Sequence, residues 1–187
     1  MSLENWLLEG IYLETILALG KLGIQGLEDE IIAIIKNSIS SDTRKEAVEV
    51  LGRSLTEKAI NYLHEAFTDS DFSVRFSAAL ILAKQNNVDS LPVLIEALGE
   101  RNSIGFEDST VCENAIDALC EIGQEALEEL EYALNDQDFQ VKRHAGLAIS
   151  KIKGEAAPID CLDIFVNQSA DDYADTLGRI CKLLKIP

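Results

Sequence analysis

A helical apolar pattern returns about every 31 residues along this chain, and this repetition constrains the fold more than any other feature of the sequence. The clearest copy, residues 69–98, has one apolar stripe at helical spacing, a polar break at residues 85–87 and then a second stripe. Asp71 is expected to cap the first helix of this copy, and Asp89 or Ser90 the second. Each copy is therefore predicted to be a pair of helices.

The copies keep one register in both helices. The small residue at the centre of the first helix recurs at intervals of 32, 31, 37 and 30 residues, as Thr15, Ala47, Ala78, Ala115 and Ala145. The aliphatic residue at the centre of the second helix recurs at 32, 31, 36 and 32 residues, as Ile31, Leu63, Leu94, Leu130 and Leu162. Such a period is typical of stacked pairs that bury their apolar sides against the pairs before and after them. We therefore predict an all-α solenoid of about five helical pairs.

The motif D-x-D-F-x-V-[RK]-x-x-A occurs at residues 69–78 and 136–145. It resembles the HEAT repeat, and the short period is similar to that of the HEAT-like repeats of the phycobilisome (bilin) lyase family. The resemblance implies a right-handed α-α superhelix in a single domain over residues 1–187, with repeats at about 3–37, 40–67, 69–98, 108–135 and 136–168. It also implies that the charged residues of the motif pair between adjacent repeats, which would give structural roles to Asp71, Arg75, Asp138 and Lys142.

The regular spacing of the repeats is interrupted once. The stack of helices must also be covered at both ends. The interval grows by about six residues at the loop 99–107, which makes Ile104 and Phe106 candidate partner-binding residues, because insertions in repeat proteins often lie on a binding face. A tolerated surface insertion is the alternative. Trp6 and a helix at 170–185 are expected to cover the two ends of the stack.

The charge of the chain excludes several classes of partner. Its 33 acidic and 16 basic residues give a net charge of −17, which disfavours nucleic acid, a HEAT-like DNA glycosylase and anionic membranes. The sequence has no apolar stretch long enough to span a membrane and no secretory signal at its start, so we predict a cytoplasmic protein. A basic protein partner is the class that this charge favours.

The second helices carry much of the acidity. Seven acids and no base lie between residues 121 and 138. The HEAT resemblance implies that the second helices line a concave face, where Glu28, Glu57, Glu96, Glu128 and Glu131 would form an acidic groove. The candidate partner-binding residues are therefore Glu96, Glu128, Glu129 and Glu131, together with Ile104 and Phe106. A solvated helix face without a partner is the alternative.

No catalytic residue, metal site or cofactor is predicted, because phosphate-binding, hydrolase and zinc motifs are absent from the sequence. The pair His64-Glu65 invites comparison with deoxyhypusine hydroxylase, a HEAT-like enzyme whose repeated His-Glu pairs hold two irons. This chain has one such pair, since His144 is followed by Ala145, so we reject that enzyme. The four cysteines are expected to be thiols, with Cys120, and also Cys112, as buried packing residues.

Two functions follow from this reading. The first is a non-catalytic scaffold or adaptor that binds another protein through the acidic groove. The second, implied by the family resemblance, is a subunit or chaperone of a bilin lyase that acts on phycobiliproteins. For the second function, Cys112, Cys161 and the loop 99–107 are the places where a bilin would be sought.

Overall fold

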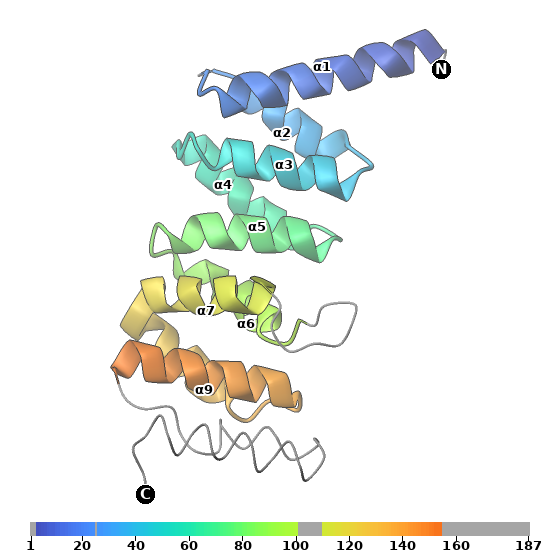
Figure 1. The fold of residues 1–187 in the computed structure, drawn as a ribbon. Coiled ribbons are helices and arrows are strands. Elements are labelled where there is room, and N and C mark those ends of the chain that lie inside the picture. Colours follow the sequence, from blue (N-terminus) through green and yellow to red (C-terminus); the bar gives the residue numbers. More distant parts are fainter. Residues whose placement is uncertain (1–2, 25, 101–109, 155–187) are drawn as a thin grey trace, which may run out of the picture.

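The computed structural model describes the backbone of residues 3–24, 26–100 and 110–154, and their side chains from Tyr12 onward. In this part of the chain the fold is entirely helical, with nine α-helices, three short 3-10 helices and no strand. Figure 1 shows the helices stacked as one elongated array, from α1 at one end to α9 at the other. The predicted all-α solenoid is confirmed. Within these residues no helix is both long enough and apolar enough to cross a membrane.

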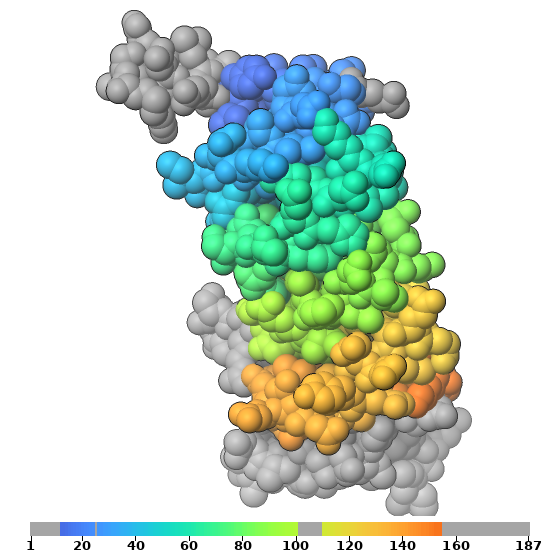
Figure 2. All heavy atoms as spheres, turned by 180° about the vertical axis from the view of Figure 1, so that it is seen from behind, coloured from blue at the N-terminus to red at the C-terminus, as the bar shows by residue number. Residues whose placement is uncertain are grey.

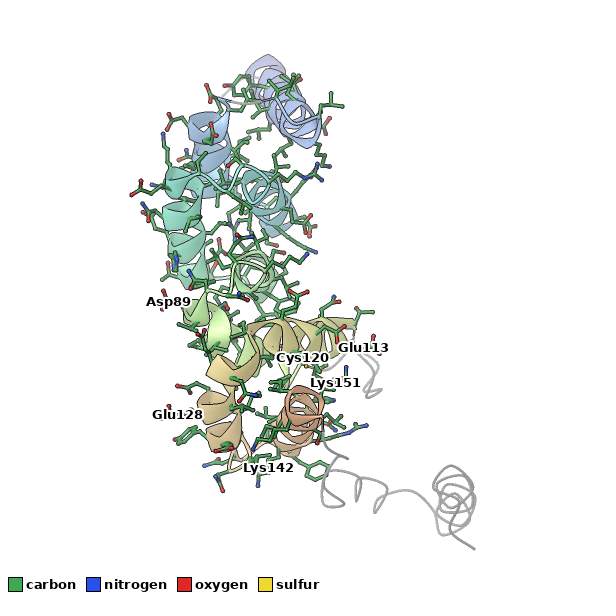
Figure 3. The ribbon with its side chains drawn as sticks, turned by 90° about the vertical axis from the view of Figure 1, so that its left-hand side faces the viewer. Asp89, Glu113, Cys120, Glu128, Lys142 and Lys151 are labelled. Atoms are coloured by element: carbon green, nitrogen blue, oxygen red, sulfur yellow. The ribbon has the colours of Figure 1, made fainter. Side chains whose placement is uncertain are left out.

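The helices alternate between two layers, which Figure 3 shows side by side. One layer holds the first helix of each pair: α1 (Leu3–Lys21), α3 (Ser41–Leu51), α5 (Phe72–Ala83), α7 (Thr110–Ile122) and α9 (Phe139–Lys153). The other holds the second helices: α2 (Glu28–Asn37), α4 (Glu57–Glu65), α6 (Leu91–Ala97) and α8 (Leu127–Ala133). The 3-10 helices η1 (Ala66–Thr68), η2 (Val88–Ser90) and η3 (Gly123–Ala126) lie at the ends of α4, α6 and α8. The predicted second helix of the fifth repeat and the predicted capping helix at 170–185 lie outside the described residues.

Side-chain caps fix where the first helices begin. The Asp71 carboxylate accepts a hydrogen bond from the Ser73 N–H at the start of α5, as the sequence predicts, and Asp138 accepts from the Gln140 N–H at the start of α9. Because these N–H groups have no partner within the helix, each cap satisfies a donor that would otherwise lack one.

The cap predicted for α6 is wrong. The side chain of Asn87, rather than that of Asp89 or Ser90, accepts the Asp89 N–H, and the Ser90 hydroxyl donates to the Asn87 carbonyl. The reason is the 3-10 helix η2, which starts the turn before α6 and moves the first free N–H groups towards Asn87. Pro92 lies in the first turn of α6, where its missing N–H costs little.

The core follows the repeat register. Ala47, Ala78, Ala115 and Ala145 are completely buried between helices. Thr15, in the equivalent place, is exposed, because α1 has a neighbouring first helix on one side only. The buried residues form two clusters, one spanning α1 to α5 and the other α5 to α9, and opposite sides of α5 belong to different clusters.

An ion pair between adjacent repeats is present, as the resemblance implies, but its acid is Asp69, the first residue of the motif, and its base is Arg44, in the register position of Arg75. Asp71 and Asp138 are held as caps of their own helices, and Lys142 makes no ion pair with a described residue. Arg44 and Asp69 join the second and third units through two N···O contacts of 2.8 Å each. Asp69 can reach the preceding unit because it lies before the capping position.

Candidate functional site

The exposed surface of α2, α4, α6 and α8, here called the second-helix face, carries the acidic residues that the sequence singled out. Figure 2 views the molecule from this side, and Figure 3 shows Asp89 and Glu128 on it, away from Glu113 and Lys151 of the first helices. Glu96, Glu128, Glu129 and Glu131 are all exposed. Ile104 and Phe106 lie outside the described residues.

Two of these four glutamates are already neutralised within the chain. Glu96 of α6 lies 2.7 Å from the Arg75 guanidinium of α5, and Glu131 of α8 lies 3.1 Å from Lys153 of α9. Two other acids of the second helices are also paired: Asp29 with Lys58, and Glu65 with Lys36. Of the five acids predicted for a groove, Glu96 and Glu131 are thus held in ion pairs between helices, whereas Glu28, Glu57 and Glu128 make no ion pair with a described residue.

Unpaired acids occur along the second-helix face, including Glu28 and Glu57, and three of them lie close together in sequence in η3 and α8. Glu125 of η3 and Glu128 and Glu129 of α8 are exposed and make no ion pair or hydrogen bond with a described residue. Tyr132, one helical turn after Glu128, is 80% exposed. We call these four residues the acidic patch. Glu128 and Glu129 lie in the first turn of α8, where the helix dipole favours a negative charge.

The acidic patch is an open surface. Three hollows of about 500, 370 and 330 Å³ lie in the half of the described array between α1 and α5, and none of them is lined by Glu96, Glu128, Glu129 or Glu131. Clustered carboxylates without counter-charges produce a local negative potential, which attracts cationic side chains. This arrangement can bind a basic surface.

The contacts of His64 indicate a role in packing two helices together. Its Nε2 lies 3.0 Å from the Asn87 amide nitrogen, its Nδ1 lies 3.5 Å from the Asp89 carboxylate, and its ring packs edge-on against Phe67. These contacts fasten the turn before α6 onto α4. Within the described residues no group of three His, Cys, Asp or Glu side chains could hold a metal ion.

The two described cysteines are free thiols with unequal burial. Cys112 is 2% exposed and its Sγ lies 3.1 Å from the Glu100 carbonyl and 3.4 Å from that of Ala97. Cys120 is only half-buried, and burial raises its pKa. The prediction of a buried packing role is therefore met more fully by Cys112 than by Cys120. Because the Cys112 thiol is buried, a bilin cannot reach it from the surface. Cys161 lies outside the described residues.

Cys112 occupies the register position of Arg44 and Arg75, and like Arg44 it donates to backbone carbonyls. Arg44 donates to the carbonyls of Ser38 and Ile39, just past the end of α2. Cys112 donates to carbonyls at the end of α6, where the buried His144 Nδ1 also lies 2.6 Å from the Leu98 carbonyl. This position thus satisfies the free carbonyl groups at the end of the preceding second helix.

Sequence reasoning missed two features of this surface. Tyr132 is an aromatic residue within an acidic run, and its exposure could have been read from its position one turn after Glu128. Glu30 has a carboxylate oxygen that is buried without a hydrogen-bond partner. The sequence carried no signal for it, because the burial of the register-equivalent residue, Tyr62, is known only from the structure.

Comparisons with known proteins agree with this fold. A model of HEAT repeats matches residues 28–105, whereas no curated protein sequence matches the chain. The complex of CpcE and CpcF of phycocyanin lyase from Nostoc sp. PCC7120 is similar in structure, with a TM-score of 0.53 and 22% identity over 78% of this chain and 60% of that one. Human deoxyhypusine hydroxylase in complex with glycerol has a TM-score of 0.47 and 22% identity over 75% of this chain and 50% of that one.

The chain thus spans about 60% of the length of the phycocyanin lyase chain that it matches, and at 22% identity the likeness concerns the fold. The repeat register, the two layers of helices and the matched family model all lead to the same assignment. A model of HEAT repeats thus matches residues 28–105, and the described residues have the fold of a HEAT-like α-α solenoid.

Proposed function

We propose that this chain is a non-catalytic protein-binding module that holds a basic partner on its acidic patch. The observation that carries the proposal is the contrast within the second-helix face: Glu96 and Glu131 are paired inside the chain, whereas Glu128 and Glu129 are exposed and unpaired. Charges that do no structural work in the array remain available for a partner.

The chemistry of the patch fits a protein surface rich in lysine or arginine. Complementary charge speeds association and fixes orientation, and a tyrosine can supply an apolar contact with a polar tip at the centre of such an interface. Tyr132 follows Glu128 by one helical turn, and 80% of its surface is exposed. The net charge of −17 adds long-range attraction for a basic partner.

The test is a comparison of partner capture by three forms of the chain. Glu128→Lys/Glu129→Lys reverses the patch, and Glu113→Lys/Glu121→Lys makes the same change of net charge on α7, in the other layer. We expect proteins from the native host that bind the wild type to be lost from the first variant and kept by the second. Binding should also weaken as salt rises from about 50 to about 300 mM, because salt screens exposed charges.

Two results would count against this function. A partner that binds all three forms equally does not use the patch. A binding that is indifferent to salt does not depend on the charge of the patch, and the acids would then serve only to keep the surface solvated.

A second candidate function is a subunit or chaperone of a bilin lyase, which rests on the likeness of fold to the phycocyanin lyase complex of CpcE and CpcF. It is tested by adding a linear tetrapyrrole to the chain, alone and with a phycobiliprotein subunit, and recording the absorption spectrum. A shift of the visible band that requires the chain supports this function, and an unchanged spectrum in both mixtures removes it.

A further inference from the structure

A hollow of about 370 Å³ lies between the α1–α2 turn and the α3–α4 turn, along the edge of the array where the turns inside each pair are stacked (Figure 1). This volume is within the range of pockets that hold small molecules. Part of its wall is aliphatic and is formed by Ile24, Leu27, Ile31, Val50 and Leu51. The hollow can therefore take up an apolar group of a few carbon atoms.

Two glycines of the α1–α2 turn leave space inside this hollow. Gly23 and Gly26 line it with φ values of +80° and +84°, a backbone conformation that glycine adopts without strain. A Cβ atom at either position would meet no atom within 4 Å apart from those of its neighbours along the chain. The wall is thus open where a side chain would otherwise project, and a ligand can approach the backbone.

Arg53 supplies a positive charge to the hollow. Its Nη1 donates to the Lys21 carbonyl at the end of α1, at 2.8 Å, which holds the side chain across the two turns. The guanidinium makes no ion pair with a described residue, and its other N–H groups have no described acceptor. The register-equivalent residue of the first unit, Lys21, is by contrast paired with Glu46. Arg53 therefore retains donors for an anionic group.

Glu28 supplies a negative charge to the same hollow. It is half-buried, and its carboxylate makes no ion pair or hydrogen bond with a described residue. Arg53 and Glu28 thus face one hollow without neutralising each other. A ligand with a single charge would leave one of them unpaired, whereas a ligand with both charges gives each a charge-assisted hydrogen bond.

We propose that this hollow binds a free apolar amino acid, such as leucine. The carboxylate of the amino acid pairs with Arg53, its ammonium group pairs with Glu28, and its side chain lies against the aliphatic wall. The bound molecule contacts both turns and so ties the first helical pair to the second. This site lies in the half of the described array between α1 and α5, remote from the acidic patch, and does not depend on it.

The probe is L-leucine, titrated into the full chain and followed by amide NMR spectra. We expect saturable shifts of the Gly20, Gly23 and Gly26 signals, because these glycines line the hollow, and none at Glu128 and Glu129. Isocaproate lacks the ammonium group of leucine, and isoamylamine lacks its carboxylate. Each should bind about tenfold more weakly than leucine, since each loses one charge-assisted hydrogen bond.

Two pairs of variants assign the contacts. Arg53→Gln and Glu28→Gln should each weaken leucine binding about tenfold. Their matched controls are Lys84→Gln, at the register position of Arg53 in the third unit, and Glu57→Gln, at the first residue of α4 as Glu28 is of α2. Both controls should keep the affinity within about twofold of the wild type. If circular dichroism shows that Arg53→Gln does not fold, Glu28→Gln decides the outcome.

Three results overturn the proposal. The first is the absence of saturable shifts with leucine, or shifts that fall outside the three glycines and their neighbours. The second is an equal affinity for leucine in the wild type and in the folded variants of Arg53 and Glu28. The third is binding of isocaproate as tight as that of leucine, because Glu28 would then make no contact with an ammonium group.

Discussion

Asp69 and Arg44 form the ion pair that ties the second unit to the third, and both side chains are nearly buried, with 12% and 13% of their surface exposed. The hydrogen bond from Arg44 is the main reason that the pKa of Asp69 lies below its ordinary value. The unfolded chain therefore binds a proton at Asp69 more readily than the folded chain does. The stabilisation is fully present above the unfolded pKa of about 3.9 and is lost as the pH falls through the lower folded pKa.

Asp69→Asn is predicted to lower the free energy of unfolding at neutral pH by about 2 kcal/mol, because it removes a charge-assisted hydrogen bond. The difference from the wild type should shrink as the pH is lowered from about 5 to about 2, since the wild type then loses the same interaction. Urea unfolding at several pH values measures it. Asp42→Asn, at an exposed acid in the first turn of α3, should change the stability by less than about 0.5 kcal/mol.

At the scale of single elements, the end of α3 comes very close to α5. A Cβ atom at Gly52 would lie 2.6 Å from the Cδ1 and 2.8 Å from the Cγ2 of Ile81. The backbone of Gly52 has a φ of −62°, which any residue adopts. Glycine is therefore needed here for steric reasons alone, because α3 and α5 approach each other closely at this point.

Gly52→Ala is predicted to destabilise the chain by about 1–3 kcal/mol, the usual cost of an extra methyl group in a packed interface. In the background of Ile81→Ala the same change should cost almost nothing, because the clashing atoms are gone. Thermal or urea unfolding of the four forms gives the coupling directly. An equal cost in both backgrounds would mean that the close contact with Ile81 is not the cause.

At the scale of the whole molecule, the array has two apolar clusters that meet at α5. Leu63 of α4 and Leu130 of α8 occupy the same register position, are both completely buried, and belong to different clusters. Because each unit contacts only its neighbours, damage to one cluster should be felt mainly in that half of the array.

Leu63→Ala is predicted to cost about 2–5 kcal/mol and to speed amide hydrogen exchange first in α1 to α4. Leu130→Ala is the matched variant and should speed exchange first in α7 to α9. Exchange followed by mass spectrometry of peptic fragments distinguishes the two patterns. The same uniform acceleration along the described chain in both variants would show that the array unfolds as one unit.

The sequence by itself determined the helices, their pairing in units of about 31 residues and the alanines at their centres, such as Ala47 and Ala78. It also determined the Asp71 cap. These features depend on helical periodicity and on groups a few residues apart, which a single sequence displays directly.

Only the tertiary structure decided which acids remain charged and free. Glu96 and Glu131 look like Glu128 and Glu129 in the sequence, but the first two lie within reach of Arg75 and Lys153, 21 and 22 residues away. The same holds for Asp69, which meets Arg44 across 25 residues. These pairings depend on how far apart two side chains of neighbouring helices lie after packing, and the repeat period alone does not specify that distance.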